Sequence, residues 1–326
     1  MRVSFIGNTE PGGSIQIARR SLSAAVSRCL VPVVLAGAAV SSFGIDSAHA
    51  ANTDVYLDWA LPADPGWYWV HYLDYVNRGS SNSIGDSSEI EYQTRTGLTG
   101  TTRDSFEFWA GGAAGYASTN GAANSSGWGV SSPDIGAEWY YAVIQPTVKQ
   151  GEPGYENLTI SPWIQVTAPN GNTTTGGYGA GADQWSYTGA LLGTYRLGRF
   201  TTTIQPVTLT YAQTNQNTSA VTNSAGTPTL TKARDGLSGS FGAINVGYDV
   251  SPTLTLGVYQ AWNVYSFADT RDSPRSAEGT IGPMFSYTGL SDSLGITIDG
   301  TMQVDYYHTS NMAQGYFLSM YVSKKF

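Results

Sequence analysis

Cysteine and histidine are nearly absent from this chain of 326 residues, which contains one cysteine and three histidines. The cysteine, Cys29, lies in the N-terminal region that we interpret below as a cleaved leader. The exported part would then have no disulfide and no thiol chemistry. It would keep two histidines, and it has no His-Glu-x-x-His motif and no cluster of ligand side chains that would indicate a catalytic metal. We therefore expect no cofactor and no enzymatic activity.

Charged residues are also scarce, at 12% of the chain, and acidic residues outnumber basic ones by 24 to 16. The first fifty residues hold four of the arginines and two of the carboxylates, which leaves 12 basic and 22 acidic residues and a net charge of −10. A surface of this sign repels nucleic acid, which needs a basic footprint. No apolar run after residue 50 approaches the roughly 20 residues of a membrane-spanning helix. Both nucleic-acid binding and a helical membrane protein are thus excluded.

The N-terminal region has the organisation of a secretory signal peptide. Arg19 and Arg20 are followed by the apolar run Leu30–Val40 and by an Ala-His-Ala sequence that ends at Ala50. This order of a basic region, an apolar region and a small-residue cleavage site predicts a signal peptide over residues 1–50. Residues 51–66 are polar and contain two prolines, Pro62 and Pro65, and we interpret them as a periplasmic lead-in to a domain over residues 67–326.

After the lead-in, long segments alternate between apolar and polar residues. In Leu294–Tyr306 one parity carries aliphatic and aromatic residues, and the other carries residues such as Asp299, Gln303 and Asp305. Successive strand residues point to opposite faces, and these segments exceed the roughly 9–11 residues that cross a bilayer at a tilt. Twelve strands are predicted: Trp67–Asn77, Ser88–Leu98, Asp104–Tyr116, Asp134–Gln145, Tyr155–Ala168, Gln184–Leu197, Arg199–Gln213, Gly236–Asp249, Thr253–Phe267, Ser276–Thr288, Ser293–His308 and Gly315–Phe326.

The fold class that follows is an all-β, up-and-down antiparallel barrel in the outer membrane of a Gram-negative bacterium. Its even strand count and its abundant glycine and tyrosine, 39 and 21 residues, are typical of such barrels. Connections after the even strands are mostly short and those after the odd strands mostly long, which is expected of periplasmic turns and extracellular loops. A secreted β-sandwich or β-solenoid is the soluble alternative, but it explains neither the segment length nor the aromatic last residue, Phe326.

The polar parity of each strand is expected to face the lumen, because a charged side chain on the lipid face at the bilayer midplane costs roughly 2–4 kcal/mol. Twelve strands enclose a narrower interior than the 16–18 strands of porins. The candidate lumen-lining residues are Glu91, Arg95, Glu138, Tyr140, Trp163, Gln165, Arg196, Tyr259, Asn263, Asp299, Gln303 and Asp305.

Three positions depart from a regular pattern. The apolar parity changes at Gln205-Pro206, where proline cannot donate to a ladder, so a β-bulge is predicted there. The first strand is aromatic on both parities, and its register stays undecided. His308 lies three residues after Asp305, a spacing that puts the two side chains on opposite faces unless a bulge intervenes. The other histidine, His71, fits an interfacial aromatic girdle.

The chain resembles a family of outer-membrane proteins associated with the meta-pathway of phenol degradation. The resemblance lies in the order of short motifs: Pro65-Gly66 before Trp67-Tyr68-Trp69, Gly127-Trp128-Gly129 before Ser132-Pro133-Asp134-Ile135-Gly136, Trp185-Ser186-Tyr187-Thr188, Gly279-Thr280-Ile281-Gly282-Pro283, and the terminal Phe326. Val130-Ser131 stands where the family commonly has Gly-Asp. The resemblance implies a transporter-like outer-membrane barrel, often encoded near aromatic catabolism, with no catalytic residues to assign.

The leading hypothesis is a channel for passive uptake of small hydrophobic or aromatic compounds. Its expected partners are the lipid bilayer of the outer membrane, a small-molecule solute, and the barrel assembly machinery, which would bind the strand ending in Phe326. Two alternatives stay open. The barrel could be plugged and act through its extracellular loops as an adhesin or receptor, with Ala51–Pro65 or Thr214–Asp235 inside the lumen, or it could be a barrel enzyme that uses His308.

Overall fold

The structure is a computed structural model that describes residues 61–79, 81–119, 125–130, 132–169, 184–214, 218–222, 228–232, 236–240, 242–266, 276–309 and 314–326. The predicted signal peptide, residues 1–50, and most of the predicted lead-in, residues 51–66, lie outside these ranges. Of the lead-in, residues 61–65 precede the first strand, and Gly66 is the first residue of that strand.

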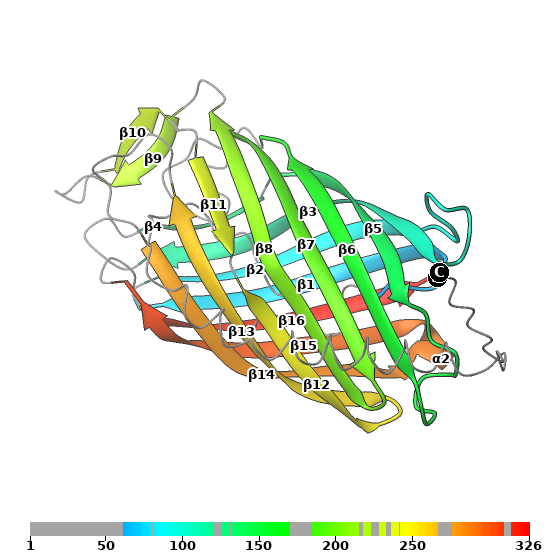
Figure 1. Ribbon diagram of the computed structural model, residues 1–326. Coiled ribbons are helices and arrows are strands. Elements are labelled where there is room, and N and C mark those ends of the chain that lie inside the picture. Colours follow the sequence, from blue (N-terminus) through cyan, green and yellow to red (C-terminus); the bar gives the residue numbers. More distant parts are fainter. Residues whose placement is uncertain are drawn as a thin grey trace, which may run out of the picture. The chain divides into compact units, whose positions relative to one another are not determined.

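Nearly all described residues belong to long antiparallel strands, which wind around one another as a barrel (Figure 1). The strands that make up the wall are β1 Gly66–Arg78, β2 Ser81–Gln93, β3 Asp104–Thr119, β5 Asp134–Ile144, β6 Glu156–Thr167, β7 Gln184–Leu197, β8 Phe200–Thr214, β12 Ala243–Ser251, β13 Leu254–Ser266, β14 Ser276–Leu290, β15 Ile296–His308 and β16 Gly315–Lys325. Each pairs with its neighbour in sequence, so the predicted twelve-stranded up-and-down barrel is confirmed.

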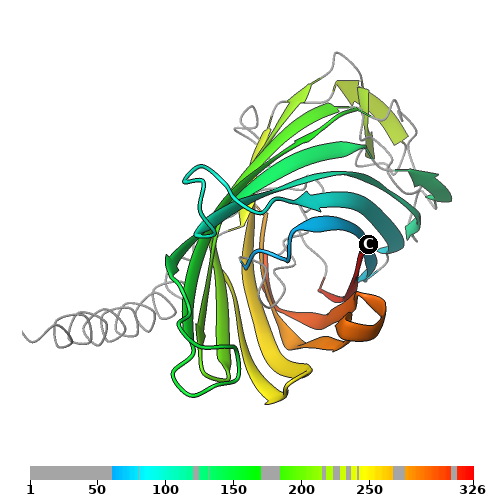
Figure 2. The same cartoon turned by 90° about the vertical axis from the view of Figure 1, so that its right-hand side faces the viewer.

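The barrel is closed by its first and last strands. β1 and β16 pair from Tyr68 opposite Lys325 to Arg78 opposite Gly315, and Phe326 donates its backbone N–H to the carbonyl of Trp67 at 3.0 Å. Viewed from the side that carries the C-terminus, the red and blue ends of the colour series lie next to each other in the ring of strands (Figure 2). Closure removes the exposed strand edges that an open sheet would present.

Four further strands are short. β4 Ser125–Val130 pairs with the end of β3, and β11 Gly236–Ser240 pairs with both β8 and β13. β9 Thr218–Thr222 and β10 Pro228–Lys232 form a separate two-stranded sheet. The predicted loop Ala117–Pro133 is therefore shorter than expected, and the predicted strand Gly236–Asp249 is two strands.

The outward face of the wall is a belt of apolar side chains. Exposed aliphatic residues from many strands lie on it, among them Ile135, Ile164, Leu191, Leu209, Val258 and Leu318, while their sequence neighbours are more buried. Large aromatic residues are exposed near strand ends, including Trp67, Trp185 and Tyr306, as expected of interfacial belts. The apolar belt and the twelve-stranded closure place the protein in the outer membrane.

Short turns join several pairs of strands at one end of the barrel, which we call the turn end. Gly198, between β7 and β8, has a φ of +60°, and Gly295 has a φ of +67° at the end of the four-residue helix α2 Ser291–Leu294. At the opposite end, which we call the loop end, the connections from β3 to β5, from β6 to β7 and from β8 to β12 are longer. Short turns face the periplasm in bacterial barrels. No helix within the described residues is long and apolar enough to span a membrane.

The second strand lies further toward the N-terminus than predicted. The sequence predicted Ser88–Leu98, but β2 covers Ser81–Gln93 and pairs with β1 along its whole length. Ser81–Ser88 is rich in serine and contains glycine, which favours a loop when judged by composition alone. The neighbouring strands β1 and β3 nevertheless supply backbone partners on both sides, and pairing overrides the weak propensity.

Two bulges change which side chains face inward. Leu191 pairs with Val207 and Gly193 with Ile204, so β8 contains one extra residue around Pro206, and the predicted bulge is confirmed. A second bulge was not predicted. On β15, Asp305 pairs with Thr280 while Tyr307 pairs with Gly279, which leaves Tyr306 as the extra residue.

The register of the first strand, which the sequence left undecided, is set by burial. Tyr68 and Val70 are buried and face inward, whereas Trp67 and Trp69 are exposed on the outward face. The same parity places Arg78 inside the barrel at the loop end.

Candidate functional site

The barrel interior is the candidate functional site, and eleven of the twelve predicted lumen residues lie on the inward parity of their strands. Eight of these side chains are buried: Glu91, Tyr140, Arg196, Tyr259, Asn263, Asp299, Gln303 and Asp305. Glu138, Trp163 and Gln165 are half-buried on the same face as buried neighbours such as Ser161. Arg95 differs. It follows the end of β2 and is exposed at the turn end, because the strand stops at Gln93.

Several interior residues were missed by the sequence analysis. Glu107 lies between Phe106 and Phe108 on β3, and that alternation is the signal that would have identified it. Arg78 was missed because the first strand was predicted to end at Asn77 and its register was left undecided. Glu278 was missed because single carboxylates near strand ends carry no distinctive pattern.

Carboxylates gather on the inner face of neighbouring strands. Glu107 of β3 lies directly opposite Glu138 of β5, and Glu91 of β2 is opposite Trp109 of β3. Directly opposed residues on one face of a sheet have Cβ atoms roughly 4.5–5.5 Å apart, and like charges there are destabilising. The Tyr140 hydroxyl donates to Oε2 of Glu107 at 2.9 Å and relieves part of this repulsion. We call Glu89, Glu91, Glu107, Asp134 and Glu138 the acidic wall.

Aromatic rings lie within the acidic wall. The rings of Trp109 and Trp163 meet edge to face with centroids 6.2 Å apart. The Trp109 ring covers Gly136, where a Cβ would lie only 2.0 Å from its Cζ2 atom. Glycine at this position therefore lets the indole lie close against β5. Tyr68, on β1, is directly opposite Glu91.

An apolar cluster also lies in the interior. A buried cluster contains Leu192, Ala243, Tyr259, Ala261 and Met284, with Trp163 and Ala190 packed against it. These residues come mainly from β12, β13 and β14, which lie opposite β2, β3 and β5 in the ring of twelve. The interior thus holds a carboxylate-rich surface and an apolar cluster, and Trp163 contacts that cluster.

A buried ion pair lies near the turn end of the barrel. Nη2 of Arg196 on β7 donates to both carboxylate oxygens of Asp249 on β12, at 3.1 and 3.0 Å. The Thr255 hydroxyl donates to Oδ1 of the same carboxylate at 2.6 Å. Both charged side chains are nearly buried, so the pair joins strands on either side of β8.

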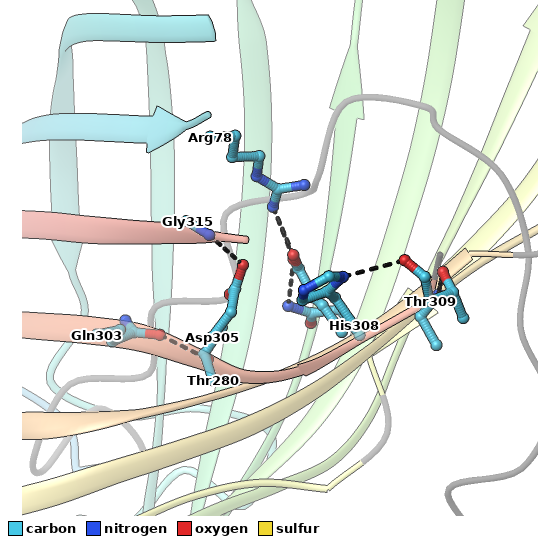
Figure 3. Close-up of polar contacts among 10 residues, drawn as sticks. Arg78, Thr280, Gln303, Asp305, His308, Thr309 and Gly315 are labelled. Carbon is cyan, nitrogen blue, oxygen red and sulfur yellow. Dashed lines mark hydrogen bonds and ion pairs between the residues drawn. The ribbon is translucent and has the colours of Figure 1, made fainter. Parts of the chain in front are cut away.

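A second polar cluster lies at the loop end (Figure 3). Nη2 of Arg78 on β1 lies 2.8 Å from Oε1 and 2.7 Å from Oε2 of Glu278 on β14, and Asn263 donates to Oε1 at 3.2 Å. Oδ2 of Asp305 accepts the backbone N–H of Gly315 at 2.8 Å. In the figure Arg78 and Asp305 approach one another from different strands. This cluster links β1, β13, β14, β15 and the start of β16.

The bulge at Tyr306 alters the expected placement of His308. Because of the extra residue, His308 is paired opposite the inward-facing Glu278 and lies on the same face as Asp305. The prediction that the two side chains occupy opposite faces applies only to a regular strand, and this strand is not regular. The His308 ring contacts the Thr309 carbonyl through Nδ1, at 3.1 Å, rather than a hydroxyl nucleophile.

His71 lies on the outward face between polar neighbours. Its Nδ1 atom is 2.9 Å from the Ser88 hydroxyl and 3.1 Å from the Asp86 carboxylate. A serine-hydrolase relay needs the acid on one ring nitrogen and the hydroxyl on the other. Here both oxygens contact the same nitrogen, so the group is a local polar cluster beside the Trp69 ring, whose centroid is 4.1 Å from the histidine ring.

We find no candidate metal site in the part of the chain that the structure describes. No group of three or more histidine, cysteine, aspartate or glutamate side chains there is arranged to hold a metal ion. The carboxylates of the acidic wall are therefore spread along the surface rather than gathered around one point.

Comparison with known proteins supports the fold. No family model matches the chain, and no curated protein matches its sequence. Among solved structures, an outer-membrane channel from Pseudomonas putida F1 aligns with a TM-score of 0.59 and 14% identity, covering 81% of this chain and 97% of that one. The β domain of the Bordetella autotransporter BrkA aligns with a TM-score of 0.50 and 11% identity, covering 81% and 100% of the two chains. This chain therefore shares the barrel fold of outer-membrane proteins.

Proposed function

We propose that the protein is an outer-membrane channel for the passive uptake of small hydrophobic or aromatic compounds. The observation that carries the proposal is the composition of the interior, where Trp109, Trp163 and Tyr259 accompany Leu192 and Met284 inside a closed twelve-stranded wall. Apolar and aromatic surface with a few placed polar groups is the lining expected of small-molecule sites. The similarity to a known outer-membrane channel supports the proposal at the level of the fold.

The resemblance to proteins associated with phenol degradation suggests single-ring aromatic compounds as the solute. Such compounds match the edge-to-face pair Trp109–Trp163, because aromatic rings prefer offset or edge-to-face contacts with centroids roughly 4.5–7 Å apart. A ring in the interior would meet the two indoles and the apolar cluster that adjoins Trp163.

Planar-bilayer recordings test the proposal. The purified protein should give discrete conductance steps, and a phenol-sized aromatic solute should interrupt them more often than a sugar at equal concentration. Trp163→Ala removes an inward ring and should change the interruptions, whereas Trp185→Ala removes an exposed ring at the strand end and should not. A barrel that conducts nothing under any condition would contradict the channel and favour a plugged barrel that acts through its loops.

We also propose that the chain reaches the membrane by signal-peptide export and insertion of its last strand by the barrel assembly machinery. Phe326 is 71% exposed and follows β16 directly, which leaves its side chain accessible to a folding partner. Mass spectrometry of the mature protein should give Ala51 as the first residue. Deletion of Phe326 should lower the amount inserted in cells while refolding in detergent stays unchanged.

A further inference from the structure

Glu91 is a buried carboxylate without a counter-charge. Its side chain is 8% exposed on the inner face of β2, and within the described residues it has no hydrogen-bond donor or cation as a partner. Its neighbours across the two adjoining strands are the rings of Tyr68 and Trp109. Burying a carboxylate without a partner costs desolvation free energy, so a carboxylate kept at such a position indicates a functional role.

Among the described residues, the surroundings of Glu91 supply further carboxyl groups and no basic side chain. Glu107 and Glu138 are directly opposite each other in the next row of the same surface. The inward-facing arginines of the described strands are engaged elsewhere, Arg78 with Glu278 at the loop end and Arg196 with Asp249 at the turn end. The acidic wall therefore presents several carboxyl groups to the interior, and the described strands place no arginine or lysine beside them.

The aromatic rings define the kind of cation that fits. The face of an indole or phenol ring attracts a cation that lies within about 6 Å of its centroid, and organic ammonium groups use such contacts. Trp109 lies beside Glu91, and Trp163 lies beside Glu138 in the neighbouring strand. The spread of the carboxylates offers no chelating group for a metal ion among the described residues. An ammonium group on an organic body is the better match.

An apolar surface suited to the rest of such a molecule adjoins the acidic wall at Trp163. Tyr259 and Met284 belong to the apolar cluster across the ring from the acidic wall, and Trp163 packs against that cluster. Carboxyl groups, indole rings and apolar side chains therefore line one interior, and this combination matches a molecule with an aromatic body and a cationic group.

We propose that the acidic wall is a binding site for aromatic organic cations, with Glu91, Glu107 and Glu138 as counter-charges and Trp109 and Trp163 as ring contacts. The inference names the solute class for the proposed channel and rests on that function only for its biological meaning, since binding is measurable without transport.

Calorimetry on the protein in detergent tests the site with three probes of one shape. The probes are 2-phenylethylammonium, neutral 2-phenylethanol and anionic phenylacetate. Because a hydrogen bond to a charged group contributes more than a neutral contact, the ammonium probe should bind roughly tenfold to a hundredfold more tightly than the alcohol. Phenylacetate should bind more weakly than either. Equal affinity for the ammonium and the alcohol would overturn the proposal.

Glutamine substitutions locate the site. Glu91→Gln keeps the shape and removes the charge, and it should reduce the affinity for the ammonium probe about tenfold while leaving that for the alcohol unchanged. If the first variant does not fold, Glu138→Gln gives an independent measurement of the affinity for the ammonium probe. Folding of each variant is checked by heat-modifiable electrophoretic mobility. Glu152→Gln, in the exposed turn between β5 and β6, is the matched control and should have no effect. Unchanged ammonium affinity in both folded interior variants would overturn the site.

These results separate the site from the channel. Loss of cation preference with intact conductance steps would remove the binding site and leave the proposed channel. Preferential ammonium binding without conductance would remove the channel and keep the site.

Discussion

Replacing Arg78 with methionine should destabilise the barrel, because Glu278 depends on Arg78 for its counter-charge. The two side chains belong to β1 and β14, their atoms approach to 2.7 Å, and Glu278 is 1% exposed while Arg78 is 24% exposed. Removing one member of a buried pair costs roughly 3–5 kcal/mol because the other charge is left uncompensated. The amide of Asn263 still donates to Glu278 at 3.2 Å in the variant, which places the expected loss near about 3 kcal/mol.

The measurement is the free energy of unfolding in phospholipid vesicles, from guanidinium titration followed by tryptophan fluorescence. Adding Glu278→Gln to Arg78→Met removes the orphaned charge and should recover part of the loss. Lys325→Met is the matched control, since Lys325 and Asp64 form an exposed pair at 3.2 Å that should contribute no more than about 1 kcal/mol. A loss for Arg78→Met that equals the control, or no recovery in the double variant, would refute a stabilising buried ion pair between Arg78 and Glu278.

Two further substitutions examine packing and membrane depth by the same titration. Gly136→Ala places a methyl group where the Trp109 ring lies, at 2.0 Å from Cζ2. This variant should lose about 1–3 kcal/mol of unfolding free energy and show an altered near-ultraviolet circular dichroism spectrum. Gly189→Ala, whose new Cβ would be 3.7 Å from its nearest atom, should show neither change. Val258→Arg on the lipid face in the middle of β13 should cost roughly 2–4 kcal/mol, but Leu197→Arg beside the turn after β7 only about 0–1 kcal/mol. Equal losses within either pair would contradict the assigned geometry.

The strands with strong period-two alternation were the predictable part of the fold. In β15 the polar parity, including Asp299 and Gln303, is buried as a set, because burial of one strand face imposes the same period on the sequence. Ser81–Ser88 was not predictable in this way. Its small polar residues carry no alternation, and its strand conformation comes from pairing with β1 and β3.

The sequence predicted which residues face the interior but not which of them contact one another. The inward parity can be deduced one strand at a time, whereas the pairing of Arg78 with Glu278 joins residues 200 positions apart. The orientation of His308 depends on a single extra residue at Tyr306. Pro206 is a sequence signal for the bulge on β8, but no proline or glycine marks the bulge at Tyr306. Long-range partners and bulges without a sequence signal are both known only once the pairing of all strands in the closed barrel is known.

The pairing of β1 with β16 has a consequence for chain connectivity. Since Tyr68 pairs with Lys325 and Phe326 bonds to Trp67, the two ends of the barrel-forming chain meet within one strand pair. A short linker between them would make the barrel circular, and the chain could then be cut in the segment between β6 and β7, residues 168–183. Such a circular permutant is expected to refold in detergent to the same ring, because the hydrogen-bonded wall does not depend on where the peptide chain begins.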